Sequence, residues 1–154
     1  MKYVIISIVM VVVLILWMMK PQSATEATQG ALSDIPRYLD ALLKSDDPHA
    51  FLVITHESSG DFLQFTAGEN TVQMDFPVIT EQQQSKAEEI KNTCSSLGLT
   101  LEESTGSGGE KFYDWNLSGT SCEMSSTIAT ALNQAFGVKP EDQLIFQHDG
   151  LTMK

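Results

Sequence analysis

The strongest pattern along the chain is an uninterrupted apolar run near its start. Residues 3–19 read YVIISIVMVVVLILWMM, with one serine and no charged side chain. As a helix this run would reach about 25 Å, at the short end of what crosses a hydrocarbon layer of roughly 30 Å. Tyr3 and Trp17 stand near its ends, where aromatic rings favour a membrane interface. The pattern predicts a transmembrane anchor at residues 1–20, and a signal peptide that is cut away is the alternative.

The charges around this run predict its orientation. The amino terminus and Lys2 lie on one side, and the twenty residues after Lys20 carry one cation, Arg37, among several acids. Because cations favour the cytoplasmic side of a membrane, the rest of the chain is expected outside the cytoplasm. This predicts a single-pass protein of the bacterial inner (plasma) membrane, whose soluble domain is periplasmic or otherwise extracytoplasmic.

After the run the chain changes to small polar residues. Residues 21–31, PQSATEATQGA, contain one proline and one glycine and show no apolar period, which is typical of a linker. A single globular domain is expected over residues 32–154, because a chain of that length can bury a core of its own.

Within this domain, apolar residues recur first with a helical period and then with a strand period. Spacings of three and four, with capping residues before them, predict helices at 33–44, 80–97 and 120–136. Alternation predicts strands at 50–57, 61–67, 71–78, 99–104 and 110–118, and a last edge strand at 144–147. Because the loops between strands are short, neighbouring strands are expected to be antiparallel. The expected fold class is α+β, with an N-terminal transmembrane helix, an antiparallel sheet in α-β-β-β-α-β-β-α order and helices packed on one face.

This order of elements is similar to that of the class I type III secretion chaperones and their YbjN-like relatives. The resemblance is carried by FLVITHESSGDFLQF, then VQMDFPVIT, a capped helix, a second strand pair and ATALNQAFGV, and it covers roughly residues 32–147. It implies an α+β sandwich, often dimeric, that binds protein segments and does not catalyse a reaction.

Strand alternation also predicts two unlike faces for the sheet. One face is almost entirely apolar and is expected to form the core: Leu52, Ile54, Leu63, Phe65, Val72, Met74, Phe76, Leu99, Leu101, Tyr113, Trp115 and Leu117. The other face mixes aromatic and polar residues, and the candidate binding residues on it are Phe51, Val53, Thr55, Phe62, Gln64, Phe112 and Asp114, beside Gln73, Asp75 and Asn116. Aromatic residues on an open sheet face favour a contact with a protein partner or with a second copy of the chain. The alternative is that the second helix or the C-terminal tail covers this face.

The two cysteines allow two interpretations. Cys94 lies late in the second helix and Cys122 opens the third. An even pair in an exported domain is typical of a disulfide, which would stabilise the fold by about 3 kcal/mol. Alternatively both are small buried thiols, since Cys94 falls on the apolar stripe of its helix.

The net charge and the lack of known catalytic and metal-binding motifs limit the classes of function that the sequence allows. The chain has 20 acidic residues against 9 lysines and arginines, a net charge of −11, so it repels phosphate backbones and nucleic acid is not an expected partner. Its histidines are scattered, and it contains no recognised metal, phosphate-loop or catalytic motif. No cofactor and no metal are expected. The sequence therefore predicts a membrane-anchored, non-catalytic protein-binding module, with a protein partner or a homodimer. A small exported enzyme with an unrecognised site, or an immunity-type inhibitor of a toxin, are the alternatives.

Overall fold

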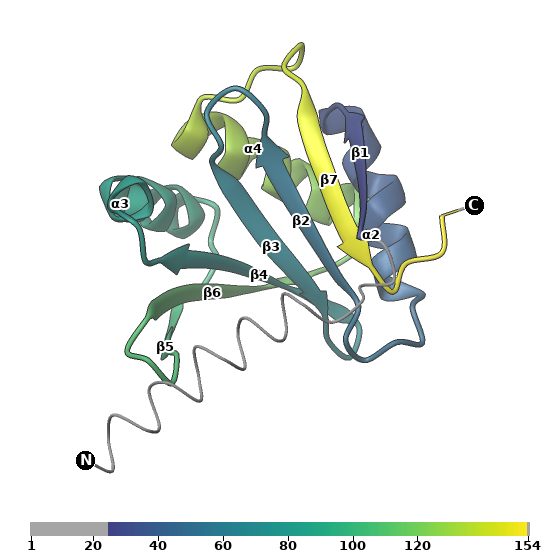
Figure 1. The fold of residues 1–154 in the computed structure, drawn as a ribbon, viewed down its shortest axis with the longest axis horizontal. Helices are drawn as coiled ribbons and strands as arrows, with labels where there is room; N and C mark the ends of the chain where they lie inside the picture. Colours follow the sequence, from purple (N-terminus) through teal and green to yellow (C-terminus); the bar gives the residue numbers. More distant parts are fainter. Residues whose placement is uncertain (1–24, 154) are drawn as a thin grey trace.

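Seven antiparallel strands form a single sheet, and three helices lie against one of its faces (Figure 1). The computed structural model describes residues 25–153. The strands of this part are β1 Glu26–Gly30, β2 Phe51–His56, β3 Phe62–Ala67, β4 Thr71–Val78, β5 Glu102–Thr105, β6 Lys111–Ser118 and β7 Leu144–Asp149. The helices are α2 Ile35–Leu43, α3 Glu81–Ser96 and α4 Ser121–Phe136, and a 3-10 turn, η1 Leu32–Asp34, precedes α2. Across the sheet the strand order is β1-β7-β2-β3-β4-β6-β5.

Local signals explain where the two long helices begin and end. Thr80 caps α3: its hydroxyl accepts a hydrogen bond from the backbone N–H of Gln83 at 3.2 Å, and the Gln83 side chain accepts the Thr80 N–H at 3.0 Å. Thr120 and Glu123 form the same reciprocal arrangement at the start of α4. Helix α4 ends at Gly137, whose φ of 72° is a left-handed conformation that glycine adopts without strain.

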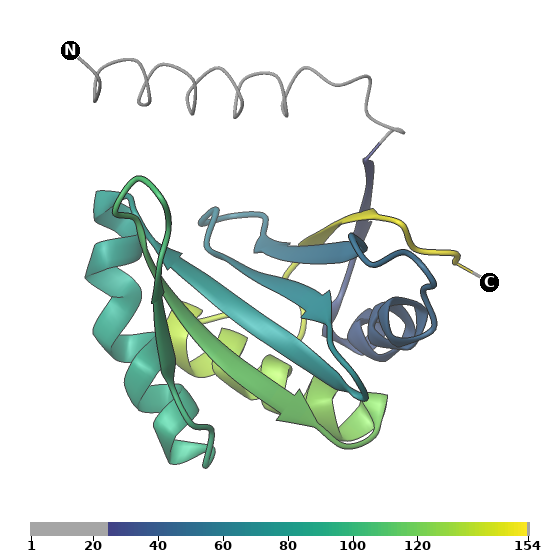
Figure 2. The ribbon, with the colours of Figure 1, turned by 90° about the horizontal axis from the view of Figure 1, so that it is seen from below.

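The core lies between the sheet and its helices, as Figure 2 shows edge-on. It is a single cluster that contains the apolar sides of β2, β3, β4, β6 and β7 together with residues from all three helices. Tyr38 of α2 stacks on Phe146 of β7 with ring centroids 4.3 Å apart, and Phe76 of β4 meets Phe136 of α4 at 5.8 Å. The first pair is stacked and the second is tilted, and these ring contacts hold α2 and α4 against the sheet.

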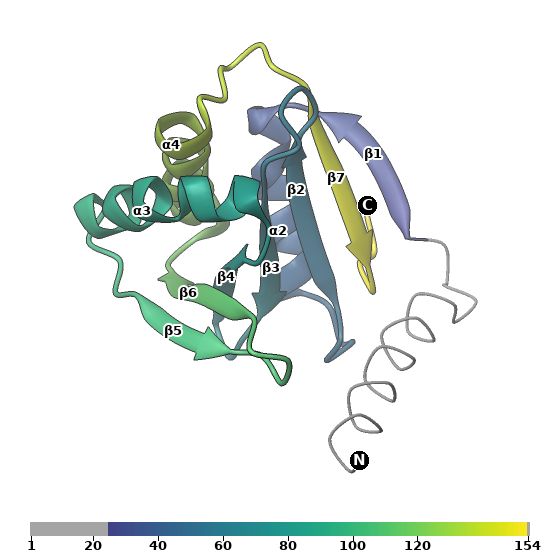
Figure 3. The same cartoon turned by 60° about the vertical axis from the view of Figure 1, so that its left-hand side comes forward.

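Two strands differ from the sequence prediction. Residues 26–30, expected in the linker 21–31, form β1, which pairs with β7 from Glu26↔His148 to Gly30↔Leu144. Strand β7 was predicted as an edge strand, but it lies between β1 and β2 (Figure 3). The reason is the same in both cases: a polar segment such as EATQG becomes a strand through hydrogen bonds to a partner far along the chain, and no local pattern encodes that partner.

The predicted fold class is confirmed in its α+β character and antiparallel sheet but corrected in its transmembrane helix. Among residues 25–153, no helix is both long and apolar enough to cross a membrane. The longest of them, α3 and α4, have 16 residues each, against about 20 apolar residues that a span requires. Residues 3–19, where the anchor was predicted, lie outside the described residues. The transmembrane, single-pass and signal-anchor description is therefore withdrawn.

Candidate binding face

The face of the sheet opposite the helices carries no helix of the described chain (Figure 2). We call it the open face and define it by the side chains that alternate with the core positions. These are Ala27 and Gln29 of β1, Phe51, Val53 and Thr55 of β2, Phe62, Gln64 and Thr66 of β3, Thr71, Gln73, Asp75 and Pro77 of β4, Phe112, Asp114, Asn116 and Ser118 of β6, Glu102 and Ser104 of β5, and Ile145, Gln147 and Asp149 of β7.

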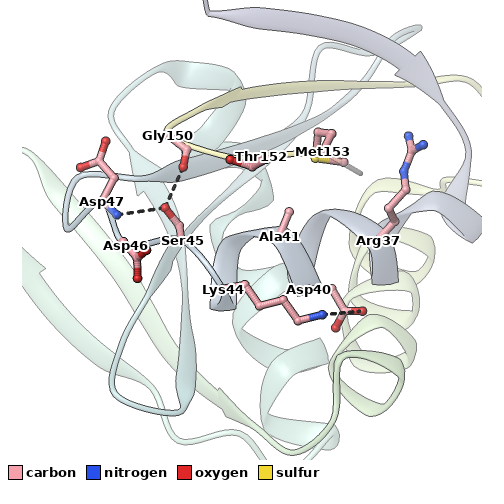
Figure 4. Close-up of a pocket in the computed structure, with 10 residues that line it drawn as sticks. All are labelled: Arg37, Asp40, Ala41, Lys44, Ser45, Asp46, Asp47, Gly150, Thr152 and Met153. Atoms are coloured by element: carbon pink, nitrogen blue, oxygen red, sulfur yellow. Dashed lines mark hydrogen bonds and ion pairs between the residues drawn. The ribbon is translucent and has the colours of Figure 1, made fainter.

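The alternative that the second helix or the C-terminal tail covers this face is wrong for the described residues. Helix α3 buries Ala87, Ile90, Thr93 and Cys94, and its apolar members belong to the core on the other side of the sheet. The tail runs beside α2, where Thr152 and Met153 line a cavity of about 1010 Å³ (Figure 4). The open face is thus left to solvent or to a partner.

All seven predicted binding residues lie on the open face. Six of them are half-buried, which means that each keeps part of its side chain accessible. Asp114 is different, because only 9% of it is exposed. The sequence missed Ile145 and Gln147, which stand opposite Thr55 and Val53 in the sheet. Alternation along LIFQ, inside the predicted strand 144–147, was the signal for them, but that strand was predicted at the edge of the sheet and its residues were assigned to neither face.

A shallow groove of about 390 Å³ crosses the open face between the start of β2 and the middle of β4. Its walls come largely from Ala50, Phe51 and Val53, and Asp75 lies in its lining on the β4 side. The groove therefore combines an apolar wall with a carboxyl group.

Asp75 is one half of a carboxyl pair at the centre of the face. It stands directly opposite Asp114 on the neighbouring strand β6. Gln73 donates a hydrogen bond to Oδ1 of Asp75 at 2.9 Å, and the Ser104 hydroxyl donates to Oδ2 of Asp114 at 2.6 Å. Burial, helped by the charge of Asp114 and by the hydrogen bond that the protonated Asp75 can give to it, raises the pKa of Asp75 from 3.8 to about 6, although Gln73 opposes the shift. Asp75 therefore takes up a proton near pH 6, and the protonated carboxyl can then donate to its neighbour.

This pKa gives a testable pH dependence of stability. Because the folded state binds the Asp75 proton more tightly than the unfolded state does, its contribution is fully present below pH 3.8 and is lost as pH rises through about 6. We expect Asp75→Asn to raise the free energy of unfolding at about pH 7.5 by on the order of 1 kcal/mol, since the half-exposed carboxyl is partly screened. The amide keeps the geometry and can donate to Asp114 as the protonated acid does.

Urea denaturation of both proteins at about pH 4 and pH 7.5 measures the effect. The two stability curves should converge at the lower pH and separate at the higher one. A constant difference at both pH values would show that Asp75 does not titrate in this range.

A second polar cluster ties together three segments at the other end of β2. The His56 ring is buried; its Nδ1 lies 3.0 Å from the Ser59 hydroxyl and its Nε2 lies 3.2 Å from Oδ2 of Asp142. Ser59 in turn donates to Oδ2 of Asp61 at 2.8 Å, and Gln82 of α3 donates to Oδ1 of the same carboxyl at 2.8 Å. Because the Ser59 proton is directed to Asp61, this serine is not activated by the histidine as a nucleophile would be. The cluster is a structural junction between the β2–β3 turn, α3 and the loop before β7.

Both cysteines are free thiols. Of the two interpretations, the disulfide between Cys94 and Cys122 is therefore wrong. Cys94 is fully buried in the core, and desolvation raises the pKa of its thiol to about 12. Cys122 is exposed at the start of α4. The buried-thiol interpretation holds for Cys94 alone, because the first turn of α4 directs Cys122 to solvent while Met124 faces the core.

The cavity beside α2 is lined by side chains of both charges, so it does not form a binding site for ions of one sign. Lys44 pairs with Asp40 at 4.0 Å, and the Ser45 hydroxyl donates to the Gly150 carbonyl at 2.7 Å (Figure 4). Its charged side chains come from α2 and from the loop after it, and they include both signs. Among residues 25–153, no three His, Cys, Asp or Glu side chains are placed to hold a metal ion.

Comparison with known proteins adds no relative at this point. The chain matches no protein-family model, no curated protein and no solved structure. The resemblance to secretion chaperones rests on element order and stays a prediction.

Proposed function

We propose that this chain is a non-catalytic binding module whose open face holds a segment of another protein. The observation that carries the proposal is a seven-stranded sheet with one face free of helices in the described chain, on which Phe51, Phe62 and Phe112 are only half-buried. Half-exposed aromatic side chains spread over several strands are typical of the contact area of a protein partner.

The charge of the domain favours a basic partner. All 20 acidic residues lie in the described part of the chain, together with six of the nine lysines and arginines. None of these six stands at an open-face position: they are Arg37, Lys44, Lys86, Lys91, Lys111 and Lys139. Lys111 is the nearest, and it pairs with Glu103 at 2.8 Å and lies over the Tyr113 ring, on the helix side of the sheet. The acidic residues of the face, which are Asp75, Asp114, Glu102 and Asp149, thus share it with no lysine or arginine of the described chain.

The same charges disfavour a homodimer through this face. A two-fold interface brings the same patch of both copies together. It would place two sets of acidic side chains within one interface, which costs free energy unless cations accompany them. A protein partner with lysine or arginine residues has no such cost. An immunity-type inhibitor that covers a basic toxin is one form that such a module could take.

The experiment that tests the proposal uses peptides selected from a random displayed library on the immobilised full chain. We expect the variant with Phe62→Ser and Phe112→Ser to bind the selected peptides at least about tenfold more weakly, a loss of about 1.4 kcal/mol. The matched control is Ile79→Ser, because Ile79 is 48% exposed but lies beyond the end of β4.

Circular dichroism of each variant separates a loss of binding from a loss of fold. Unchanged affinity in the folded double variant would overturn the proposal, as would the failure of the library to yield any specific peptide. Global unfolding of the double variant would show instead that Phe62 and Phe112 belong to the core.

A further inference from the structure

We infer that the groove on the open face receives a lysine or arginine side chain of the bound segment. This inference rests on the proposed function and names the chemistry of the partner. The groove offers, within one cavity, both an apolar wall and a carboxyl group.

The shape of the groove fits a long side chain with a charged end. Phe51 and Val53 form the wall on β2, and Asp75 lies across β3 on β4. Lysine and arginine bury their methylene stems along apolar surface while their charged heads meet a polar group. A segment that crosses the face can therefore lay such a stem against Phe51 and place its cation at Asp75.

Other side chains fit the groove less well. An apolar side chain would remove water from Asp75 without offering a hydrogen-bond donor, and an unpaired buried carboxylate is costly. An acidic side chain would add a third carboxylate beside Asp75 and Asp114. A cation relieves the repulsion that already exists between these two residues.

The cation and the proton compete for the same carboxyl pair. When the cation binds, the proton held by Asp75 is released to solvent, so binding weakens as pH falls through the pKa of about 6. The other polar and charged groups around Asp75 lie farther along the sheet or at the end of the groove. Gln64 of β3 stands opposite it and is uncharged, Glu102 lies beyond Asp114 on β5, and His49 lines the groove.

The test again uses the full chain and the selected peptides as probes. We expect lysine or arginine to be enriched in these peptides. Replacing that residue by norleucine, which keeps the stem and removes the charge, should reduce the affinity at least about tenfold for the native chain. The same replacement should have less than about a twofold effect when Asp75→Asn is the receptor, because its charge is already gone.

A matched control removes charge from elsewhere on the surface. Glu69 and Glu141 are both exposed in loops outside the open face, so the variant with Glu69→Gln and Glu141→Gln should keep the full preference for the cation. The affinity of the native chain should also fall between about pH 7.5 and pH 5, whereas that of Asp75→Asn should change little.

The possible outcomes separate this inference from the proposed function. Peptides that lose affinity with Phe62→Ser and Phe112→Ser but show no preference for a cation would overturn the inference and leave the proposed function standing. A preference for the cation that survives Asp75→Asn would overturn the inference, because it would then arise from the general negative charge of the domain. A preference that disappears equally in the variant with Glu69→Gln and Glu141→Gln would overturn it for the same reason. The absence of any specific peptide would overturn both.

Discussion

Replacing Phe146 by alanine is expected to lower the free energy of unfolding by about 3–5 kcal/mol, the range for a large aromatic side chain removed from a packed core. Phe146 is fully buried and stacks on Tyr38 at 4.3 Å between ring centroids. It also lies on β7, which hydrogen-bonds to β1 on one side and β2 on the other. Its loss would leave a cavity beneath α2, at the point where β1 and β7, the first and last strands of residues 25–153, pair in the sheet.

The neighbouring residue provides the control. Ile145 belongs to the same strand but points to the open face, where it is half-buried. Ile145→Ala should cost about 1 kcal/mol, because it removes a partly solvated side chain and leaves no internal cavity. Urea denaturation of the two variants, followed by circular dichroism, compares them directly. Equal costs would contradict the placement of β7 with one face in the core and one face open.

Replacing His56 by alanine is expected to cost about 2–3 kcal/mol, since it removes a buried ring together with the polar contacts that this ring makes to Ser59 and Asp142. The ring contacts Ser59 at Nδ1 and Asp142 at Nε2, and its exposed fraction is 6%. Through Ser59 and Asp61 the same junction reaches Gln82 in the first turn of α3. The loss should therefore loosen the β2–β3 turn and the loop before β7 together.

Hydrogen exchange can locate the loosened segments, and denaturation can give the total cost. The matched control is His49→Ala, because His49 is exposed and its side chain has no hydrogen bond described within residues 25–153; its substitution should change stability by less than about 0.5 kcal/mol. A His56 variant as stable as the His49 variant would show that the junction contributes nothing to the fold.

The elements that the sequence predicted well are those with complete local signals. The capping box at Thr80 and the glycine stop at Gly137 place helix ends within a residue or so of their observed positions. Strict alternation places β4 at residues 71–78, as observed. Such signals act over one or two helical turns or along one strand, so the residues of the segment itself determine its structure.

The fourth predicted strand shows where alternation misleads. It was expected at 99–104, but β5 begins at Glu102 and all four of its residues are exposed. Leu99 and Leu101 pack against the core from the connection that precedes the strand. The sequence prediction assigned these leucines to a strand, whereas they pack a loop against the core. In a single sequence, a buried loop residue and a buried strand residue produce the same apolar pattern.

The sequence by itself determined that an α+β domain with an antiparallel sheet would form, and that one sheet face would be apolar and the other mixed, because strand alternation assigns every side chain to a face. Only the tertiary structure decided which strands that are distant in the sequence become neighbours. That choice inserted β7 between β1 and β2, set Asp75 opposite Asp114 and shaped the groove beside them. The physical reason is that pairing between distant strands depends on hydrogen bonds and packing summed over the whole sheet, which no local stretch of residues contains.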